Sequence, residues 1–133
     1  MAKLRHLAIT VPDPQAAAGF YEQTFEMHRV WESDLRVMLS DDTVSLAILK
    51  FPTDEMAGDE RGKDFHGLHH MGFVVDDVYG MQRVIEGNGG RYHMQVRGGQ
   101  AGSGERKFRD PNGVVFDIVD ERYAKYSWEG PLS

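Results

Sequence analysis

Two histidines and one carboxylate are the residues of this chain whose types and spacing could do chemistry. His6 and His70 occupy the same place in two similar segments, 4–11 (LRHLAITV) and 68–75 (LHHMGFVV). Asp117 lies inside a third apolar segment, 114–119. Two neutral imidazoles and one carboxylate form a ligand set for a divalent metal that keeps coordination positions open. The sequence therefore indicates a metal centre made of His6, His70 and Asp117.

The argument for this centre depends on an internal repeat, because a single strand histidine is more often structural than a ligand. An offset of 64 residues superposes His6 on His70 and Val11 on Val75. It also brings together two predicted helix starts, at residues 13–14 and 76–78. Two histidines at equivalent repeat positions would face each other across a cleft that Asp117 also enters.

Hydrophobic periodicity predicts the elements of the first half of the repeat. The segment 7–11 is a strand, and a helix follows with Asp13 as its N-cap and Pro14 at its first position. The helix would bury one face, which consists of Ala17, Phe20, Tyr21 and Phe25. Three further strands are predicted at 30–32, 35–39 and 44–49, the first two as a hairpin.

The second half repeats this order. A strand over 71–75 is followed by a helix with Val78, Met81, Val84 and Ile85 on one face, which ends at Asn88-Gly89-Gly90. Strands at 92–96, 106–108 and 114–119 complete the half. The sequence thus predicts an α+β fold of two βαβββ modules that form an open, barrel-like cleft. We expect a single domain over 1–133, with module one at 4–52, a linker at 53–66, module two at 67–122 and an aromatic C-terminal tail at 123–133.

Composition excludes several classes of function. The 133 residues include 21 acidic and 15 basic side chains, so the surface should repel nucleic acid. No apolar run approaches the roughly 20 residues of a membrane helix, and the N-terminus lacks the apolar core of a signal peptide. The absence of cysteine excludes disulfides and thiolate chemistry and fits a reducing cytoplasm. We therefore expect a soluble cytoplasmic protein that binds a small molecule and neither nucleic acid nor membranes.

The two modules, the histidine strands and the turn 110–113 (DPNG) before the strand of Asp117 together resemble the vicinal oxygen chelate superfamily. This superfamily includes glyoxalase I, bleomycin and fosfomycin resistance proteins, and extradiol dioxygenases. The resemblance covers residues 4 to about 119. It implies a metal in the cleft with His6, His70 and Asp117 at ligand positions, and it implies a homodimer.

Two departures from the family pattern affect the expected reaction. When segment 110–117 is laid on 40–47, the fourth ligand position of the family falls on Ala47, which cannot bind a metal. Extradiol dioxygenases and fosfomycin-modifying transferases resemble this chain in using two histidines and one carboxylate. The family carboxylate is nearly always glutamate, whereas this chain has Asp117, so its strand must lie closer to the metal by about 1.5 Å.

Two other side chains are candidates for catalysis or for the second shell of the metal. His93 could handle protons as a second-shell histidine does in extradiol enzymes, and Tyr123 is a further candidate. By strand alternation His69 should point away from the cleft, whereas Ser45, Ala47 and Leu49 should line its first-module wall.

The preferred interpretation is a metal-dependent enzyme that cleaves a catechol-like ring with dioxygen, with iron(II) as the metal. One alternative is a glyoxalase-type lyase or isomerase or a thiol transferase of the fosfomycin-resistance type, with zinc, manganese or nickel. Another is a binding protein that sequesters a small molecule without turnover. The sequence leaves open whether the site lies within one chain or is shared across a dimer.

Overall fold

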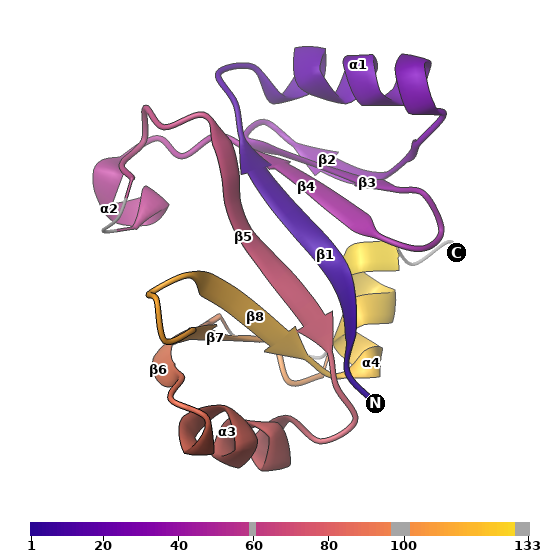
Figure 1. The fold of residues 1–133 in the computed structure, drawn as a ribbon. Helices are drawn as coiled ribbons and strands as arrows, with labels where there is room; N and C mark the ends of the chain where they lie inside the picture. Colours follow the sequence, from indigo (N-terminus) through magenta and orange to yellow (C-terminus); the bar gives the residue numbers. More distant parts are fainter. Residues whose placement is uncertain (59–60, 97–101, 130–133) are drawn as a thin grey trace.

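The computed structural model describes residues 1–58, 61–96 and 102–129 (Figure 1). The first half contains β1 (Lys3–Thr10), α1 (Pro14–Phe25), β2 (His28–Ser33), β3 (Arg36–Ser40), β4 (Ser45–Leu49) and the short α2 (Asp54–Ala57). The second half contains β5 (Gly67–Val74), α3 (Val78–Gly87), β6 (Arg91–Val96), β7 (Glu105–Arg109) and β8 (Val115–Val119). The chain continues through α4 (Glu121–Tyr123) into a π-helical segment, η1 (Ala124–Glu129). The predicted α+β class and the order of elements are confirmed.

All the described strands belong to one open sheet in the order β2-β3-β4-β1-β5-β8-β7-β6. β1 pairs with β4, and β5 with β8, in parallel, and the other neighbours are antiparallel. The predicted β2–β3 hairpin is confirmed. β1 and β5 lie side by side at the centre and join the two halves (Figure 1).

The register between β1 and β5 shows the internal symmetry of the chain. His6 lies opposite Gly72, and Ala8 lies opposite His70. An offset of 64 residues exchanges these two pairs, so a local two-fold axis passes between the central strands. The repeat read from the sequence is thus a repeat in space, and it places His6 and His70 on the same face of the sheet.

Each long helix begins at an aspartate cap and covers the outer face of one half of the sheet. The Asp13 carboxylate accepts a hydrogen bond from the N–H of Ala16 at 3.2 Å, and Asp77 does the same for Gly80 at 3.0 Å. α1 packs on β3 and β4, and α3 packs on the second half, as two apolar clusters show. In the first cluster, Ala18 of α1 packs with Val37, Leu39 and Ile48 of the sheet. In the second, Val78 of α3 packs with Val75, Phe108 and Ile118.

The predicted buried face of α1 is wrong in part. Phe20 and Phe25 are 56% and 63% exposed, whereas Ala18 is completely buried. The small side chain of Ala18 lets the helix approach the sheet closely, which turns the two large rings to the flank. There they pack edge-on against each other, with ring centroids 6.3 Å apart.

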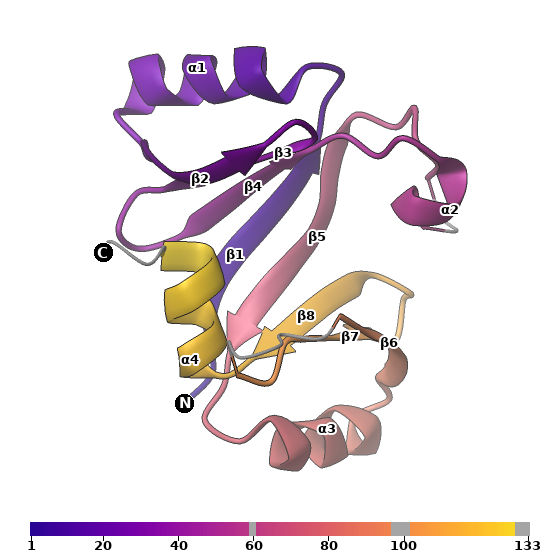
Figure 2. The same cartoon turned by 180° about the vertical axis from the view of Figure 1, so that it is seen from behind.

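The inner face of the sheet holds a third apolar cluster, to which the C-terminal helical segment contributes. α4 and η1 lie against the inner face beside β1 (Figure 2). Tyr123, Ala124 and Trp128 pack there against Ala8 and Val119. The described part of the aromatic tail, residues 123–129, therefore docks on the body of its own chain. No helix in the described parts of the chain is long and apolar enough to span a membrane.

Candidate metal centre

His6, His70 and Asp117 come together on the inner face of the sheet, from the central strands β1 and β5 and from β8 next to them. One ligand atom of each lies within 4.8 Å of the others. His6 is 2% exposed and Asp117 is fully buried. All three residues belong to one chain. The short Asp117 reaches the histidines because β8 is hydrogen-bonded directly to β5.

A chain of hydrogen bonds fixes which nitrogen of His6 faces the site. The Ser45 hydroxyl donates to the Met38 sulfur at 3.0 Å, so its oxygen accepts from Nδ1 of His6, 2.8 Å away. The proton of His6 therefore sits on Nδ1, and Nε2 keeps a free lone pair. Burial, followed by the charge of His70, lowers the pKa of His6 to about 3, which keeps this ring neutral.

His70 is oriented in the same way through its neighbour His69. The Ala57 carbonyl oxygen lies 2.7 Å from Nε2 of His69, which must therefore donate. Nδ1 of His69 then accepts from Nδ1 of His70 at 2.8 Å, so when the His70 ring is neutral its Nε2 is the nitrogen that can bind a metal. The prediction that His69 points away from the cleft is wrong, because a β-bulge at this residue interrupts the alternation of β5.

Asp117 divides its two oxygens between a lysine and the histidines. Oδ1 lies 2.7 Å from the Lys107 ammonium, whereas Oδ2 is 3.3 Å from Nε2 of His70. Oδ2 is buried and makes no hydrogen bond within the described part of the chain. Burial acts to raise the pKa of Asp117, but Lys107 and then His70 outweigh it, so the net pKa is well below its usual range.

These contacts fit a divalent cation. One ligand atom each of His6, His70 and Asp117 converges within 4.8 Å, and Oδ2 of Asp117 has no hydrogen-bond partner within the described part of the chain. The 3.3 Å between His70 and Asp117 is close to the spacing of neighbouring ligands, about 3 Å for metal bonds of about 2.1 Å. A metal ion held by this set would act as a Lewis acid and leave positions open for a substrate.

The register of β4 shows why its strand supplies no fourth ligand to the set. Ala8 of β1 pairs with Ala47 of β4, just as Gly72 of β5 pairs with Asp117 of β8. Ala47 is thus the symmetry counterpart of Asp117, as the sequence predicts. Its methyl group lines the cleft where a second carboxylate would otherwise face the metal.

The indole of Trp128 closes one side of the centre. It stacks on the His6 ring at a centroid distance of 4.4 Å and an interplanar angle of 4°. A Cβ on Gly72 would lie only 2.9 Å from this indole and 3.1 Å from Cβ of His6, so the stack requires glycine at this position. The aromatic composition of the tail was the only sequence signal for this contact.

Two further charged residues of the site, Lys107 and Glu105, are not predicted from the sequence. Both side chains point from β7 into the cleft. The next residue, Phe108, points to the opposite face and packs under α3. The side chains of Lys107 and Glu105 are 13% and 17% exposed, and Lys107 Nζ lies 3.7 Å from Oε1 of Glu105. Residues 105, 106, 107 and 109 are all charged, so the sequence of β7 does not tell which of them face the cleft. The pairing of Lys107 with Asp117 of β8 is visible only in the fold.

The cleft has a volume of about 990 Å³. Its walls include the predicted candidates His93 and Tyr123, together with apolar side chains such as Leu49, Phe51 and Val96. Burial, followed by the charge of Glu105, raises the pKa of Tyr123 above its usual value, so its phenol stays protonated. The predicted wall position of Ala47 and Leu49 is confirmed, whereas Ser45 instead supports His6.

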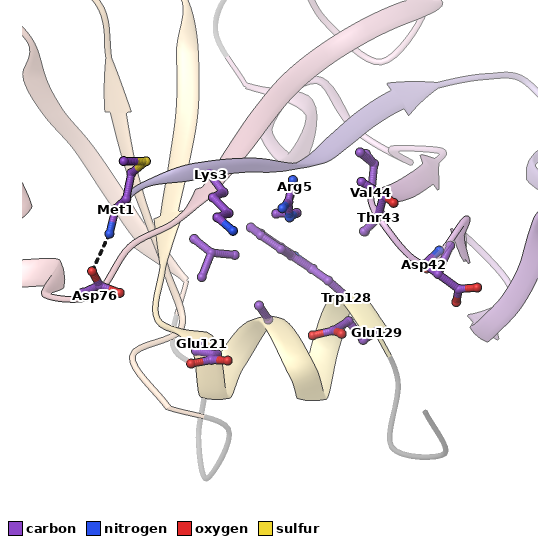
Figure 3. A pocket seen from close by; sticks show the side chains of 14 residues that line it. Met1, Lys3, Arg5, Asp42, Thr43, Val44, Asp76, Glu121, Trp128 and Glu129 are labelled. Atoms are coloured by element: carbon purple, nitrogen blue, oxygen red, sulfur yellow. Dashed lines mark hydrogen bonds and ion pairs between the residues drawn. The ribbon is translucent and has the colours of Figure 1, made fainter.

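A second, smaller pocket of about 410 Å³ lies beyond Trp128, which borders both spaces. Figure 3 shows Lys3 and Arg5 above the indole, with Glu121 and Glu129 on the helical side. At its edge the Met1 ammonium bonds to Asp76 at 2.6 Å. Among the described residues, the three-ligand cluster lies on the His6 side of Trp128 and not in this pocket.

Comparison with known proteins places the chain in a family. A family model described as the Glyoxalase/Bleomycin resistance protein/Dioxygenase superfamily matches residues 3–118. The chain therefore belongs to this superfamily, and the resemblance inferred from its sequence is confirmed. No curated protein matches the chain significantly.

Solved structures share the fold at low sequence identity. A hypothetical protein from Bacillus halodurans aligns with a TM-score of 0.69 and 17% identity over 90% of this chain and 94% of that one. Methylmalonyl-CoA epimerase from Mycobacterium tuberculosis aligns with a TM-score of 0.62 and 22% identity over 88% and 86%. A Mn(II)-bound glyoxalase from Novosphingobium aromaticivorans aligns with a TM-score of 0.67 and 15% identity over 90% of this chain and 38% of that one. These likenesses establish the fold alone.

Proposed function

We propose that this chain is a divalent-metal-dependent enzyme that binds a small molecule through two neighbouring oxygens and opens a catechol-like ring with dioxygen. The observation that carries the proposal is the ligand set of His6, His70 and Asp117 with Ala47 at the fourth position. Two histidines and one carboxylate on one face of a metal, with the remaining positions open, are typical of non-heme iron(II) oxygenases. Iron(II) is accordingly the proposed metal.

The cleft supports this reaction in two further ways. A metal held by three protein ligands would keep positions open for a diol and for dioxygen, and so would bring the reactants together. The apolar walls, with Leu49 and Phe51 among them, suit a flat ring and exclude water from it. The Lys107 ammonium beside Asp117 adds positive charge that stabilises a deprotonated diol.

The experiment is a comparison of oxygen uptake on a panel of catechols. Protein purified without oxygen and loaded with iron(II) is expected to consume one dioxygen per catechol and form a yellow ring-opened product. His70→Ala should abolish uptake, and Glu121→Gln, an exposed change outside the cleft, should leave it intact. If the iron-loaded protein takes up no oxygen, and the protein loaded with zinc, manganese or nickel instead consumes methylglyoxal–glutathione adduct or fosfomycin, the dioxygenase proposal is wrong.

The proposed site is complete within one chain, so activity should not depend on protein concentration even if the chain forms the homodimer that is expected from its family. A chain that binds a catechol but turns over neither substrate class with any of these metals would be a binding protein, which is the remaining alternative.

A further inference from the structure

Met38 of β3 takes the place in the first half of the chain that Lys107 takes in the second. Met38 pairs with Ala47 of β4, as Lys107 pairs with Asp117 of β8. Because alanine replaces the carboxylate opposite it, this position needs no positive charge. Met38 is 7% exposed and lines the cleft. Its sulfur does more than fill space, since it lies 3.0 Å from the hydroxyl oxygen of Ser45.

The hydroxyl of Ser45 has one proton and two neighbours that can accept it. Its oxygen lies 2.8 Å from Nδ1 of His6 and 3.0 Å from the Met38 sulfur. A thioether can only accept, whereas an imidazole nitrogen accepts or donates according to the tautomer. When the hydroxyl proton points to the sulfur, Nδ1–H of His6 donates to the hydroxyl oxygen and both bonds form. When it points to His6, the sulfur has no donor and the ring proton sits on Nε2, the nitrogen that a metal needs.

The carboxylate of Asp117 favours this second tautomer in the metal-free protein. Its Oδ2 is buried, has no hydrogen-bond partner in the described part of the chain, and belongs to the same cluster as His6. A negative oxygen there attracts a proton to the metal-facing side of the ring. Trp128 lies parallel to the ring and so bonds neither nitrogen. Within the described residues, the Ser45 hydroxyl is thus the contact that opposes Asp117, and it does so only while Met38 holds its proton.

We propose that the Met38 sulfur selects the metal-binding tautomer of His6 by accepting the Ser45 hydroxyl proton, which makes Met38 a positioning residue for this ligand. Between the two tautomers a proton leaves one ring nitrogen and another binds the second, so the charge of the ring is the same in both. The inference concerns the metal centre and does not depend on which substrate or reaction the cleft serves.

The first measurement locates the proton directly. In metal-free protein with isotope-labelled histidines, the NMR shift of each ring nitrogen shows whether it carries a proton, and the His6 signals are assigned by comparison with His6→Gln. At neutral pH the wild-type ring is expected to carry its proton on Nδ1, whereas in Met38→Leu most of it should sit on Nε2. Met94→Leu changes another methionine of the cleft wall and should leave the proton on Nδ1.

The second measurement is a double-mutant cycle on zinc affinity, measured by calorimetry. Met38→Leu should weaken zinc binding about tenfold, because the bound metal forces the proton back to Nδ1 and leaves a buried hydroxyl without an acceptor. Leucine is close to methionine in volume, so the packing is retained. In a Ser45→Ala background no hydroxyl can turn, and the same change should alter the affinity less than about twofold.

Two results would overturn the inference and leave the proposed function intact. One is a His6 proton that stays on the same nitrogen in wild type and Met38→Leu, and the other is an equal loss of zinc affinity with and without the Ser45 hydroxyl. If Met38→Leu does not fold, norleucine in place of the methionines removes the sulfur and keeps the shape, and an unchanged proton position then decides against the inference. Wild-type protein that binds no zinc, iron(II) or manganese(II) would contradict the metal centre, and with it both proposals.

Discussion

Replacing Gly72 with alanine tests the packing that holds His6 against Trp128. The new Cβ would lie 2.9 Å from Cη2 and 3.1 Å from Cζ2 of the indole, and 3.1 Å from Cβ of His6. Carbon atoms in contact prefer about 3.5–4.0 Å, so the indole must move by roughly 0.5–1 Å. Such overpacking costs about 1–3 kcal/mol of unfolding free energy, or roughly 3–10 °C in Tm for a domain of this size.

The same displacement should weaken metal binding, because the parallel indole fixes the ring plane of His6. We expect the dissociation constant for zinc, measured by calorimetry on the purified protein, to rise at least about tenfold. Gly19→Ala is the matched control. Gly19 lies within α1 with no atom within 4 Å of an added Cβ, so alanine there should stabilise the protein by about 0.5–1 kcal/mol and leave zinc affinity unchanged.

A double-mutant cycle with Trp128→Phe checks the cause. Phenylalanine lacks the part of the indole nearest Gly72, so the combined variant should be more stable than the sum of the two single changes predicts. A Gly72→Ala protein with the Tm and zinc affinity of wild type, or a cycle without coupling, would refute the account of this wall.

Three further changes test the charges of the site. Lys107→Met should tighten divalent-metal binding about tenfold or more, because it removes the ammonium 2.7 Å from Asp117. It should also lower the unfolding free energy of the metal-free protein by about 3 kcal/mol. A metal affinity equal to that of wild type, measured by calorimetry, would contradict this prediction. Ala47→Asp places a carboxylate at the symmetry counterpart of Asp117 and should supply a fourth ligand. It should therefore tighten zinc binding and lower oxygen-dependent turnover. An unchanged zinc affinity would count against the two-fold arrangement. The metal-free protein should lose stability as pH falls from about 6.5 towards 4, by up to about 1.4 kcal/mol per pH unit from His6. The pKa of His6 in the folded chain is about 3, below the unfolded value, so the unfolded chain binds the proton first. Urea titrations should show that the unfolding free energy falls less steeply with pH in His6→Gln, and an equal dependence would show that His6 is not buried as a neutral ring.

The repeat allowed much of this architecture to be predicted from the sequence. Equivalent positions in two similar segments predicted that His6 and His70 share one face, and the β1–β5 register confirms it. The same repeat identified Ala47 as the counterpart of Asp117. These inferences succeed because strand alternation and a tandem repeat are both properties of local sequence.

The remaining features depend on contacts that local patterns do not encode. The bulge at His69 breaks the alternation on which its predicted orientation rested. Lys107 and Glu105 become site residues only because β7 pairs with β8, which sets Lys107 opposite Asp117. The exposure of Phe20 and Phe25 follows from the close approach of Ala18 to the sheet, which helical periodicity alone does not determine.

Metal content and affinity test the central claim most directly. Wild-type protein, stripped of metal and titrated with iron(II) without oxygen, should bind one ion per chain. Asp117→Asn and His70→Ala, each folded by circular dichroism, should lose this binding by at least about a hundredfold. Wild-type protein that binds no iron(II), manganese(II) or zinc(II), or variants that bind as tightly as wild type, would contradict the assignment of His6, His70 and Asp117 as the metal centre.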